Sequence, residues 1–177
     1  RGAKIFTHAA CDEVIRRAAH WEARIEQGGE QLTVRARGLV NAAGPWAARF
    51  ALRANRVAPH RALRLIKGSH IVVPRLFEHS CAYLFQHADG RVVFAIPYEE
   101  AFTLVGTTDI DFEGDPGSAA IGDGEVRYLC ELANRYFKRQ LAPGDVVWSY
   151  SGVRPLLEDD AASAAAATRD YFLERDA

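Results

Sequence analysis

The side chains best suited to chemistry lie in a short segment where Arg64, Lys67, Ser69 and His70 surround a single glycine, Gly68. The segment runs directly into an apolar, β-branched stretch over residues 71–74, which predicts a buried strand. Cationic and imidazole side chains at the edge of a buried strand can bind an anion next to an acid–base group. His70 is the candidate base, because the pKa of a histidine lies nearest to neutral pH. The alternative is a buried, hydrogen-bonded histidine with a structural role.

Three more clusters of polar residues lie at the ends of predicted strands, where side chains from distant segments can meet in one cleft. They are Gly106-Thr107-Thr108-Asp109, Gly152-Val153-Arg154-Pro155 and Thr168-Arg169-Asp170. Glycine and proline around Arg154 fix its backbone and leave the guanidinium to grip a carboxylate or a phosphate. An ordinary ion pair with Glu158 or Asp159 is the alternative. The cluster 107–109 is suited to hydrogen bonding a polyol, or to closing a turn.

Charge is distributed unevenly, although the net charge is only -1. Residues 31–77 contain no acidic side chain but many basic ones, including Arg64 and Lys67. Either this stretch provides a positive field for an anionic ligand, or its arginines are solvated and balanced by later acids. Binding to nucleic acid is disfavoured, because the stretch lacks interleaved aromatic residues and any helix-turn-helix or RNA-binding signature.

Cysteine usage and hydropathy narrow the class of protein. The three cysteines are odd in number and far apart, which is typical of reduced thiols, and no cysteine or histidine spacing predicts a metal site. No apolar run is long enough for a membrane helix, and no signal peptide is recognisable. Because the chain starts at Arg1 and contains no methionine, we expect it to be an internal piece of a longer protein.

The elements that must position these residues follow from periodicity and turn signals. Alternating apolar residues predict one hairpin over 21–25 and 32–36, around a glycine turn, and another over 92–96 and 102–106. Further strands are expected over 4–8, 14–15, 71–73, 83–86, 146–150 and 169–173, and helices over 45–53 and 123–140. The apolar stripe of the second helix includes Cys130, which we assign to the core. The pattern predicts an α+β fold, with a mixed, largely antiparallel sheet and a few helices.

Five motifs occur together in a fixed order. They are Leu39-Val40-Asn41-Ala42-Ala43-Gly44-Pro45-Trp46, Arg64-Leu65-Ile66-Lys67-Gly68-Ser69-His70-Ile71-Val72-Val73-Pro74, Leu104-Val105-Gly106-Thr107-Thr108-Asp109, Tyr150-Ser151-Gly152-Val153-Arg154-Pro155-Leu156 and Thr168-Arg169-Asp170-Tyr171. Jointly they resemble the FAD-dependent glycerol-3-phosphate dehydrogenases over nearly the whole chain. The resemblance implies the substrate domain of a D-amino-acid-oxidase-like fold. The related amine and D-amino-acid oxidases are not expected to carry the Lys-Gly-Ser-His and Gly-Thr-Thr-Asp blocks.

The resemblance implies an enzyme that oxidises sn-glycerol 3-phosphate to dihydroxyacetone phosphate, with hydride transfer to N5 of FAD and quinone as the acceptor. It implies a cytoplasmic protein, peripheral at the inner face of the cytoplasmic membrane, that acts on a small-molecule phosphate and not on nucleic acid. Homo-oligomer formation is left open. The alternatives are a glycerol-3-phosphate oxidase and a non-catalytic module that binds an anion or nucleotide.

Residue roles are carried over from the same resemblance. His70 would be the base for the 2-hydroxyl proton, and Arg154, also counted as catalytic, would hold the anionic end of the substrate. The other substrate-binding residues would be Lys67, Thr107, Thr108, Asp109 and Arg169. The segment 41–46 has small side chains before a helix start, which suits a nucleotide, and Ala42, Ala43, Gly44 and Trp46 would contact FAD.

Two parts of the family pattern are missing from this sequence. The Gly-x-Gly-x-x-Gly turn that seats the FAD pyrophosphate is absent, and so is the glycine-rich lysine segment that completes the sites. We therefore assign residues 1–50 to a partial FAD-binding domain, 51–150 to a substrate-binding domain and 151–177 to a return segment toward the FAD-binding domain. On its own, this chain is expected neither to retain FAD nor to turn over substrate.

Overall fold

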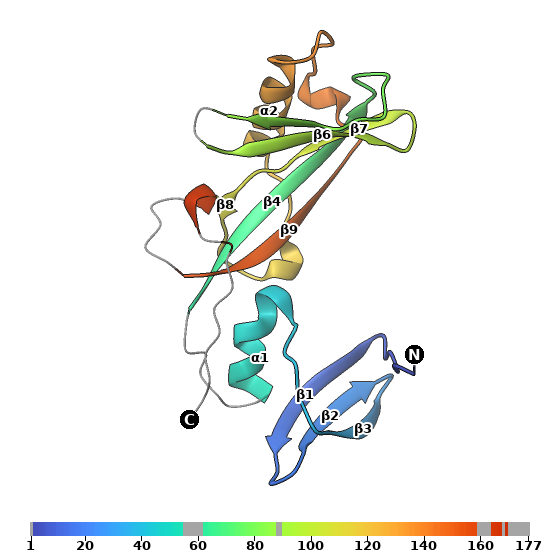
Figure 1. The fold of residues 1–177 in the computed structure, drawn as a ribbon, viewed down its shortest axis with the longest axis vertical. Coiled ribbons are helices and arrows are strands. Elements are labelled where there is room, and N and C mark those ends of the chain that lie inside the picture. Colours follow the sequence, from blue (N-terminus) through green and yellow to red (C-terminus); the bar gives the residue numbers. More distant parts are fainter. Residues whose placement is uncertain (1, 55–61, 88–89, 159–163, 168, 170–177) are drawn as a thin grey trace. The chain divides into compact units, whose positions relative to one another are not determined.

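The computed structural model describes residues 2–54, 62–87, 90–158, 164–167 and 169 of the 177-residue chain. The chain folds into two compact units, Arg1–Ala62 and Leu63–Ala177 (Figure 1). Among the described residues, no helix is both long enough and apolar enough to cross a bilayer. The functional assignment of residues 1–50, 51–150 and 151–177 stays a prediction.

The first unit begins with an antiparallel sheet in the order β1-β2-β3. Its strands are β1 (Ala9–Arg16), β2 (Trp21–Gln27) and β3 (Glu30–Ala36). Gly28 and Gly29 both have positive φ, as a tight hairpin turn between twisted strands requires, so the predicted hairpin is confirmed. The predicted strand over 4–8 is wrong, and the predicted strand over 14–15 is the end of the longer strand β1. Pairing starts at Ala9, opposite the last residue of β2, so earlier residues have no partner strand there.

A short helical segment follows this sheet. It consists of the 3₁₀ turn η1 (Gly44–Trp46) and the helix α1 (Ala47–Ala54), as the sequence predicts. Asn41 organises the entry: its side-chain carbonyl accepts from the amide of Ala43 at 3.2 Å, and its amide donates to the carbonyl of Ala47 at 2.9 Å. Pro45 stands where an N–H would have no helical partner.

The second unit is built around one long strand, β4 (Leu63–Pro74). Its sheet has the order β5-β6-β7-β4-β8, with β9 on the other side of β4, and every pairing is antiparallel. The partner strands are β5 (Tyr83–Gln86), β6 (Val92–Tyr98), β7 (Phe102–Gly106), β8 (Ile110–Asp111) and β9 (Trp148–Leu157). The α+β class with a largely antiparallel sheet is therefore confirmed.

One face of this sheet is covered by α2 (Asp123–Asn134), as Figure 1 shows. Ile71, Val73 and Val105 of the sheet pack with Leu129 and Cys130 of the helix in the main core, so the core assignment of Cys130 is confirmed. The predicted extension of this helix to residue 140 is wrong. The Asn134 side chain accepts from the amide of Leu141 at 2.7 Å and donates to its carbonyl at 2.9 Å, which folds the chain back.

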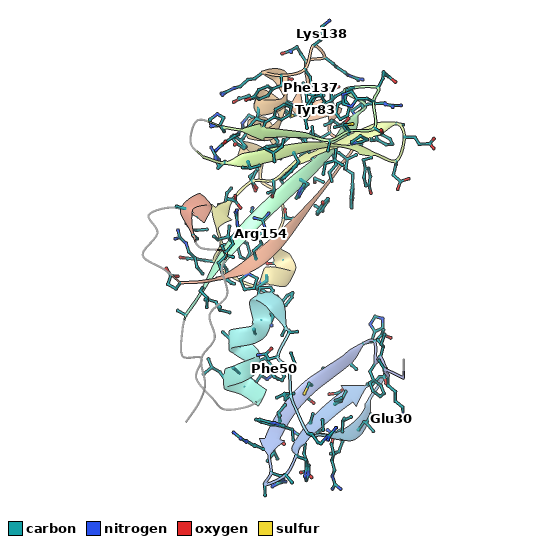
Figure 2. All side chains as sticks on the ribbon, viewed as in Figure 1. Glu30, Phe50, Tyr83, Phe137, Lys138 and Arg154 are labelled. Carbon is teal, nitrogen blue, oxygen red and sulfur yellow. The ribbon has the colours of Figure 1, made fainter. Side chains whose placement is uncertain are left out.

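An aromatic cluster joins β5 to the segment after α2. Phe137 stacks on Phe77, with ring centroids 5.5 Å apart, and meets Tyr83 edge-on at 5.4 Å. Figure 2 shows Tyr83 and Phe137 together at this end of the unit. Such ring pairs add about 0.5–1.5 kcal/mol each beyond their buried area. They hold the edge strand β5 against the helical segment.

Two strands are longer than expected, and this changes where the polar clusters lie. β4 was predicted only over 71–73 and β9 only over 146–150, yet they pair with each other from Leu63–Leu157 to Val72–Trp148. Lys67 to His70 and Arg154 therefore lie within strands, and their expected position at strand ends is wrong. Pro155 is tolerated because β9 pairs with β4 alone among the described strands.

Short turns complete the described residues. They are the 3₁₀ turns η2 (Pro116–Ser118), η3 (Pro143–Asp145) and η4 (Ala164–Ala166). Ala164 and Ala167 pack against Ile66 in a second, smaller core cluster. The strand predicted over 169–173 lies outside the described residues, apart from Arg169 itself.

Candidate functional site

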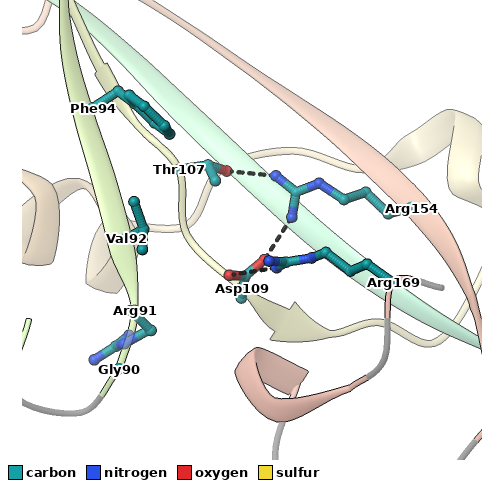
Figure 3. A pocket seen from close by; sticks show the side chains of 8 residues that line it. All are labelled: Gly90, Arg91, Val92, Phe94, Thr107, Asp109, Arg154 and Arg169. Carbon is teal, nitrogen blue, oxygen red and sulfur yellow. Dashed lines mark hydrogen bonds and ion pairs between the residues drawn. The ribbon is translucent and has the colours of Figure 1, made fainter. Parts of the chain in front are cut away.

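Three segments of the second unit bring their polar side chains together around Asp109. Arg154, from β9, donates from Nη1 to Asp109 Oδ1 at 2.5 Å and from Nη2 to Thr107 Oγ1 at 3.0 Å. Arg169 donates from Nη2 to Asp109 Oδ2 at 3.4 Å. Thr107 and Asp109 belong to the turn between β7 and β8, as Figure 3 shows. The ion-pair partner of Arg154 is thus Asp109, and not one of the acids close to it in sequence that the sequence analysis considered.

These residues line a pocket of about 190 Å³. Its other walls come from Gly90, Arg91, Val92 and Phe94, at the start of β6 (Figure 3). Three arginines and one aspartate give the pocket a net positive charge, so its field favours an anion. The Asp109 side chain is only 6% exposed, whereas those of Arg154 and Arg169 are 35% and 59% exposed. The carboxylate therefore orients two guanidinium groups that can still reach a ligand.

Gly68 explains why the Arg154 guanidinium can lie where it does. In the β4–β9 ladder Gly68 is paired with Gly152, and a Cβ atom on Gly68 would stand 2.5 Å from both Arg154 Nη2 and Thr107 Oγ1. A Cβ on Gly152 would meet no heavy atom within 4 Å. The missing side chain at position 68 thus provides the space that the guanidinium and the threonine hydroxyl occupy.

His70 lies two residues further along β4. Its ring stacks on Tyr150 with centroids 4.8 Å apart, and it covers Gly106, where a Cβ would collide with the imidazole. Nδ1 of His70 is buried without a hydrogen-bond partner among the described residues. Burial, and then the positive charge of Arg154, hold the pKa of His70 below its ordinary value. The imidazole is therefore neutral near pH 7, which is the form that accepts a proton.

The pocket lining does not include Lys67, Ser69 or Thr108. Their side chains all bind the carboxylate of Glu125 in α2, each at 2.7 Å. Side chains alternate along β4, so Gly68 and His70 lie on the face toward Arg154 and Gly106, and Lys67 and Ser69 lie on the face toward Glu125. His70 itself is not among the residues that line the pocket. The substrate-binding roles given to Lys67 and Thr108 stay predictions, and the contacts seen here are with Glu125. Nothing in the sequence linked Glu125 to these residues.

Arg64, the other basic residue singled out near β4, is engaged by an acid. It donates from Nε and Nη2 to the two carboxylate oxygens of Asp111, at 2.6 and 2.9 Å. This bidentate pair lies across the β4–β8 ladder. The Arg64–Asp111 pair agrees with the alternative in which arginines of residues 31–77 are balanced by acids later in the chain.

The first unit has a pocket of its own, of about 200 Å³. Ala43 and Trp46, two of the predicted FAD contacts, line it together with residues of β1 and with Arg49 and Arg53 of α1. Ala42 and Gly44 are not among its lining residues; Gly44 has positive φ, and a Cβ there would meet nothing within 4 Å. The lining combines small side chains with two guanidinium groups and one carboxylate, that of Asp12, so its net positive charge fits an anionic nucleotide cofactor that approaches the backbone closely.

Comparison with known proteins gives a consistent match. The family model described as FAD dependent oxidoreductase matches residues 1–174. A glycerol-3-phosphate dehydrogenase of Pseudomonas aeruginosa is 45% identical over 173 residues, which is 97% of this chain and 34% of that protein. A D-erythritol 1-phosphate dehydrogenase of Brucella abortus is 42% identical over 178 residues, covering 99% of this chain and 36% of that protein.

A solved structure agrees with these matches. The glycerol-3-phosphate dehydrogenase of Bacillus halodurans, complexed with FAD, superposes with a TM-score of 0.76 and 29% identity over 91% of this chain and 34% of that one. The chain spans about a third of the length of the curated relatives it matches. The resemblance stated from the five motifs is therefore confirmed over nearly the whole chain.

Proposed function

The chain belongs to the FAD dependent oxidoreductase family, and from that premise we propose that it forms part of an enzyme oxidising sn-glycerol 3-phosphate to dihydroxyacetone phosphate. The observation that carries the proposal is a positively charged pocket organised by Asp109, together with the His70 imidazole, whose pKa is lowered by burial and by the charge of the pocket residue Arg154. When bound, FAD supplies the acceptor for the hydride that leaves carbon 2 of the substrate. The residues of this chain bind the substrate, orient it and take its proton.

Arg154 and Arg169 would bind the phosphate. A guanidinium offers two parallel N–H donors, which match two oxygens of a phosphate group. Arg154 already uses one Nη for Asp109 and the other for Thr107, so its plane is fixed before the ligand arrives. Preorganisation of this kind lowers the cost of binding, because fewer side-chain rotamers remain to be frozen.

His70 would act as the base for the 2-hydroxyl proton. Its ring is held between Tyr150 and Gly106 in one orientation. The nearby charge of Arg154 disfavours the imidazolium, so at neutral pH the free enzyme presents the unprotonated ring. The phosphate of the substrate would offset this charge on binding and so make the ring a better proton acceptor.

Ala42, Ala43, Gly44 and Trp46 would contact FAD, and Arg49 and Arg53 would add positive charge to the same pocket. The electron acceptor would be quinone, with the enzyme cytoplasmic and peripheral at the inner face of the cytoplasmic membrane. The 177-residue chain alone is expected neither to retain FAD nor to turn over.

Kinetics of the full-length protein that contains this chain test the proposal. Purified protein with FAD is supplied with glycerol 3-phosphate, and reduction of a soluble dye is followed anaerobically. Saturable dye reduction by glycerol 3-phosphate, with far weaker reduction by glycerol, is expected. A preference for D-erythritol 1-phosphate would reassign the substrate, and rapid oxygen consumption in air would identify an oxidase. If no polyol phosphate reduces the dye, the proposed reaction is wrong.

A further inference from the structure

Glu125 carries a buried carboxylate that the proposed reaction does not use. The residue is only 6% exposed, although it lies in the first turn of α2. One oxygen, Oε1, accepts from the hydroxyls of Ser69 and Thr108, each at 2.7 Å. The other, Oε2, accepts from Lys67 Nζ at 2.7 Å and from the amide of Gly122 at 2.9 Å. Four donors saturate the carboxylate, which therefore ties α2 to β4 and to the β7–β8 turn.

The Thr108 contact connects this cluster to the pocket. Thr108 lies between Thr107 and Asp109, the two residues that hold Arg154. Its hydroxyl also accepts from the amide of Ser69 at 3.0 Å, and its own amide donates to the carbonyl of Ser69 at 3.3 Å. Thr108 thus pins the turn to β4 on the side of Glu125, while the side chains of Thr107 and Asp109 line the pocket. A shift of Thr108 must move both anchors of the guanidinium.

Stability alone does not account for this cluster. Leu129 and Leu132 already fix α2 to the core through apolar contacts. A buried ion pair such as Lys67–Glu125 is often no more stabilising than apolar residues of the same volume, because both charges lose their hydration. A hydrogen-bonded carboxylate does, however, impose directions on its donors that apolar packing does not.

We propose that Glu125 is a positioning residue of the phosphate-binding pocket: through Thr108 it fixes the β7–β8 turn and so sets the direction of the Arg154 guanidinium. This inference rests on the proposed function only for the identity of the substrate. The contacts require that an anion bound by Arg154 depends on Glu125, whichever polyol phosphate is oxidised.

The full-length enzyme with FAD provides the test, and the probe is inorganic phosphate, measured as a competitive inhibitor and by direct titration. Glu125→Ala is expected to raise both the KM for glycerol 3-phosphate and the inhibition constant of phosphate about tenfold or more, because small displacements of a binding group are costly. Glu125→Gln keeps an oxygen that can accept from the two hydroxyls, but its amide nitrogen faces the Lys67 ammonium and the Gly122 amide, which are both donors, so it should recover only part of the affinity. Thr108→Val breaks the link from its other end and should act like Glu125→Ala.

Leu132→Ala is the matched control. Leu132 lies in the same helix and is 2% exposed, and its truncation destabilises the core without touching the carboxylate cluster. It should lower the melting temperature yet leave the KM and the phosphate affinity close to those of the parent. Equal effects of Leu132→Ala and Glu125→Ala on phosphate affinity would overturn the inference, as would unchanged affinity in Thr108→Val. A parent protein that binds phosphate but oxidises no polyol phosphate would refute the proposed function alone.

Discussion

Replacing Gly68 by alanine should separate activity from stability in this protein. The added Cβ would stand 2.5 Å from Arg154 Nη2 and from Thr107 Oγ1. Non-bonded heavy atoms need about 3.5 Å, so the guanidinium must retreat by about 1 Å. Displacements of that size can cost about a hundredfold in rate. We therefore expect kcat/KM to fall about a hundredfold.

The stability of the Gly68→Ala variant should change far less. Overpacking costs about 1–3 kcal/mol, and the lower end applies here because the tip of an arginine side chain can swing aside. Gly68 does not have positive φ, so alanine fits its backbone conformation. Thermal unfolding of the full-length enzyme measures this cost, and dye-linked oxidation of glycerol 3-phosphate measures kcat/KM.

Gly152→Ala is the matched control for this prediction. Gly152 faces Gly68 in the ladder and a Cβ there would meet no heavy atom within 4 Å, so its kcat/KM should stay within about twofold of the parent. Parent-like kinetics in Gly68→Ala would show that the guanidinium position does not matter for turnover. A similar loss in both variants would attribute the effect to the stiffer backbone of the paired strands.

Three further predictions follow from the same geometry. Arg154→Ala should lower kcat/KM about thirtyfold, which corresponds to about 2 kcal/mol for losing one member of a charge pair that is partly exposed to solvent. Arg127→Ala, which removes an exposed arginine of α2, should leave kcat/KM unchanged, and steady-state kinetics of the two variants test this difference. Because burial and then the charge of Arg154 lower the pKa of His70, the acid limb of the pH profile of kcat/KM should lie below pH 6.5. His70→Asn should remove that limb and slow the reaction about a hundredfold or more. A parent-like pH profile in this variant would exclude His70 as the base. Burial raises the pKa of Glu125, but its bonds to Lys67, the amide of Gly122 and two hydroxyls outweigh this and hold it below the ordinary value of 4.5. The contribution of Glu125 to stability is therefore complete above about pH 4.5 and is lost as the pH falls through the lower folded-state pKa. In urea unfolding between pH 6 and pH 3, the free energy of unfolding of Glu125→Gln should depend less steeply on pH than that of the parent. An identical slope in the two proteins would contradict the reasoning.

The sequence predicted the architecture well where local signals are strong. Alternation and a glycine turn located the β2–β3 hairpin, and the limits of β5 and β7 agree with the structure. The length of β4 could not be predicted in this way, because its polar half forms a strand by pairing with β8 and β9, which are distant in sequence. The end of α2 was not predicted correctly for a similar reason, because it depends on the contact between Asn134 and Leu141.

The candidate site shows the same division between local and distant information. Arg154, Asp109 and Arg169 were each proposed from local pattern or resemblance, and the structure brings them into contact. Their pairing could not be derived, because the partners are far apart in sequence and no local rule joins them. Glu125 escaped altogether, since an acidic residue in the first turn of a helix usually needs no explanation beyond the helix dipole. Arg91, at the start of a short strand, gave no signal either.

Because side chains alternate along β4, the site depends on whether an odd or an even number of residues is inserted into or deleted from this strand. Gly68 and His70 lie on the face of β4 toward Arg154 and Gly106, and Lys67 and Ser69 lie on the opposite face, toward Glu125. Inserting or deleting one residue in this strand would turn the lysine and serine into the cavity and send the imidazole toward the helix. Length changes in homologous proteins should therefore be confined to the loops on either side of β4, and a laboratory library that varies the length of this strand should yield active members only where pairs of residues are added or removed.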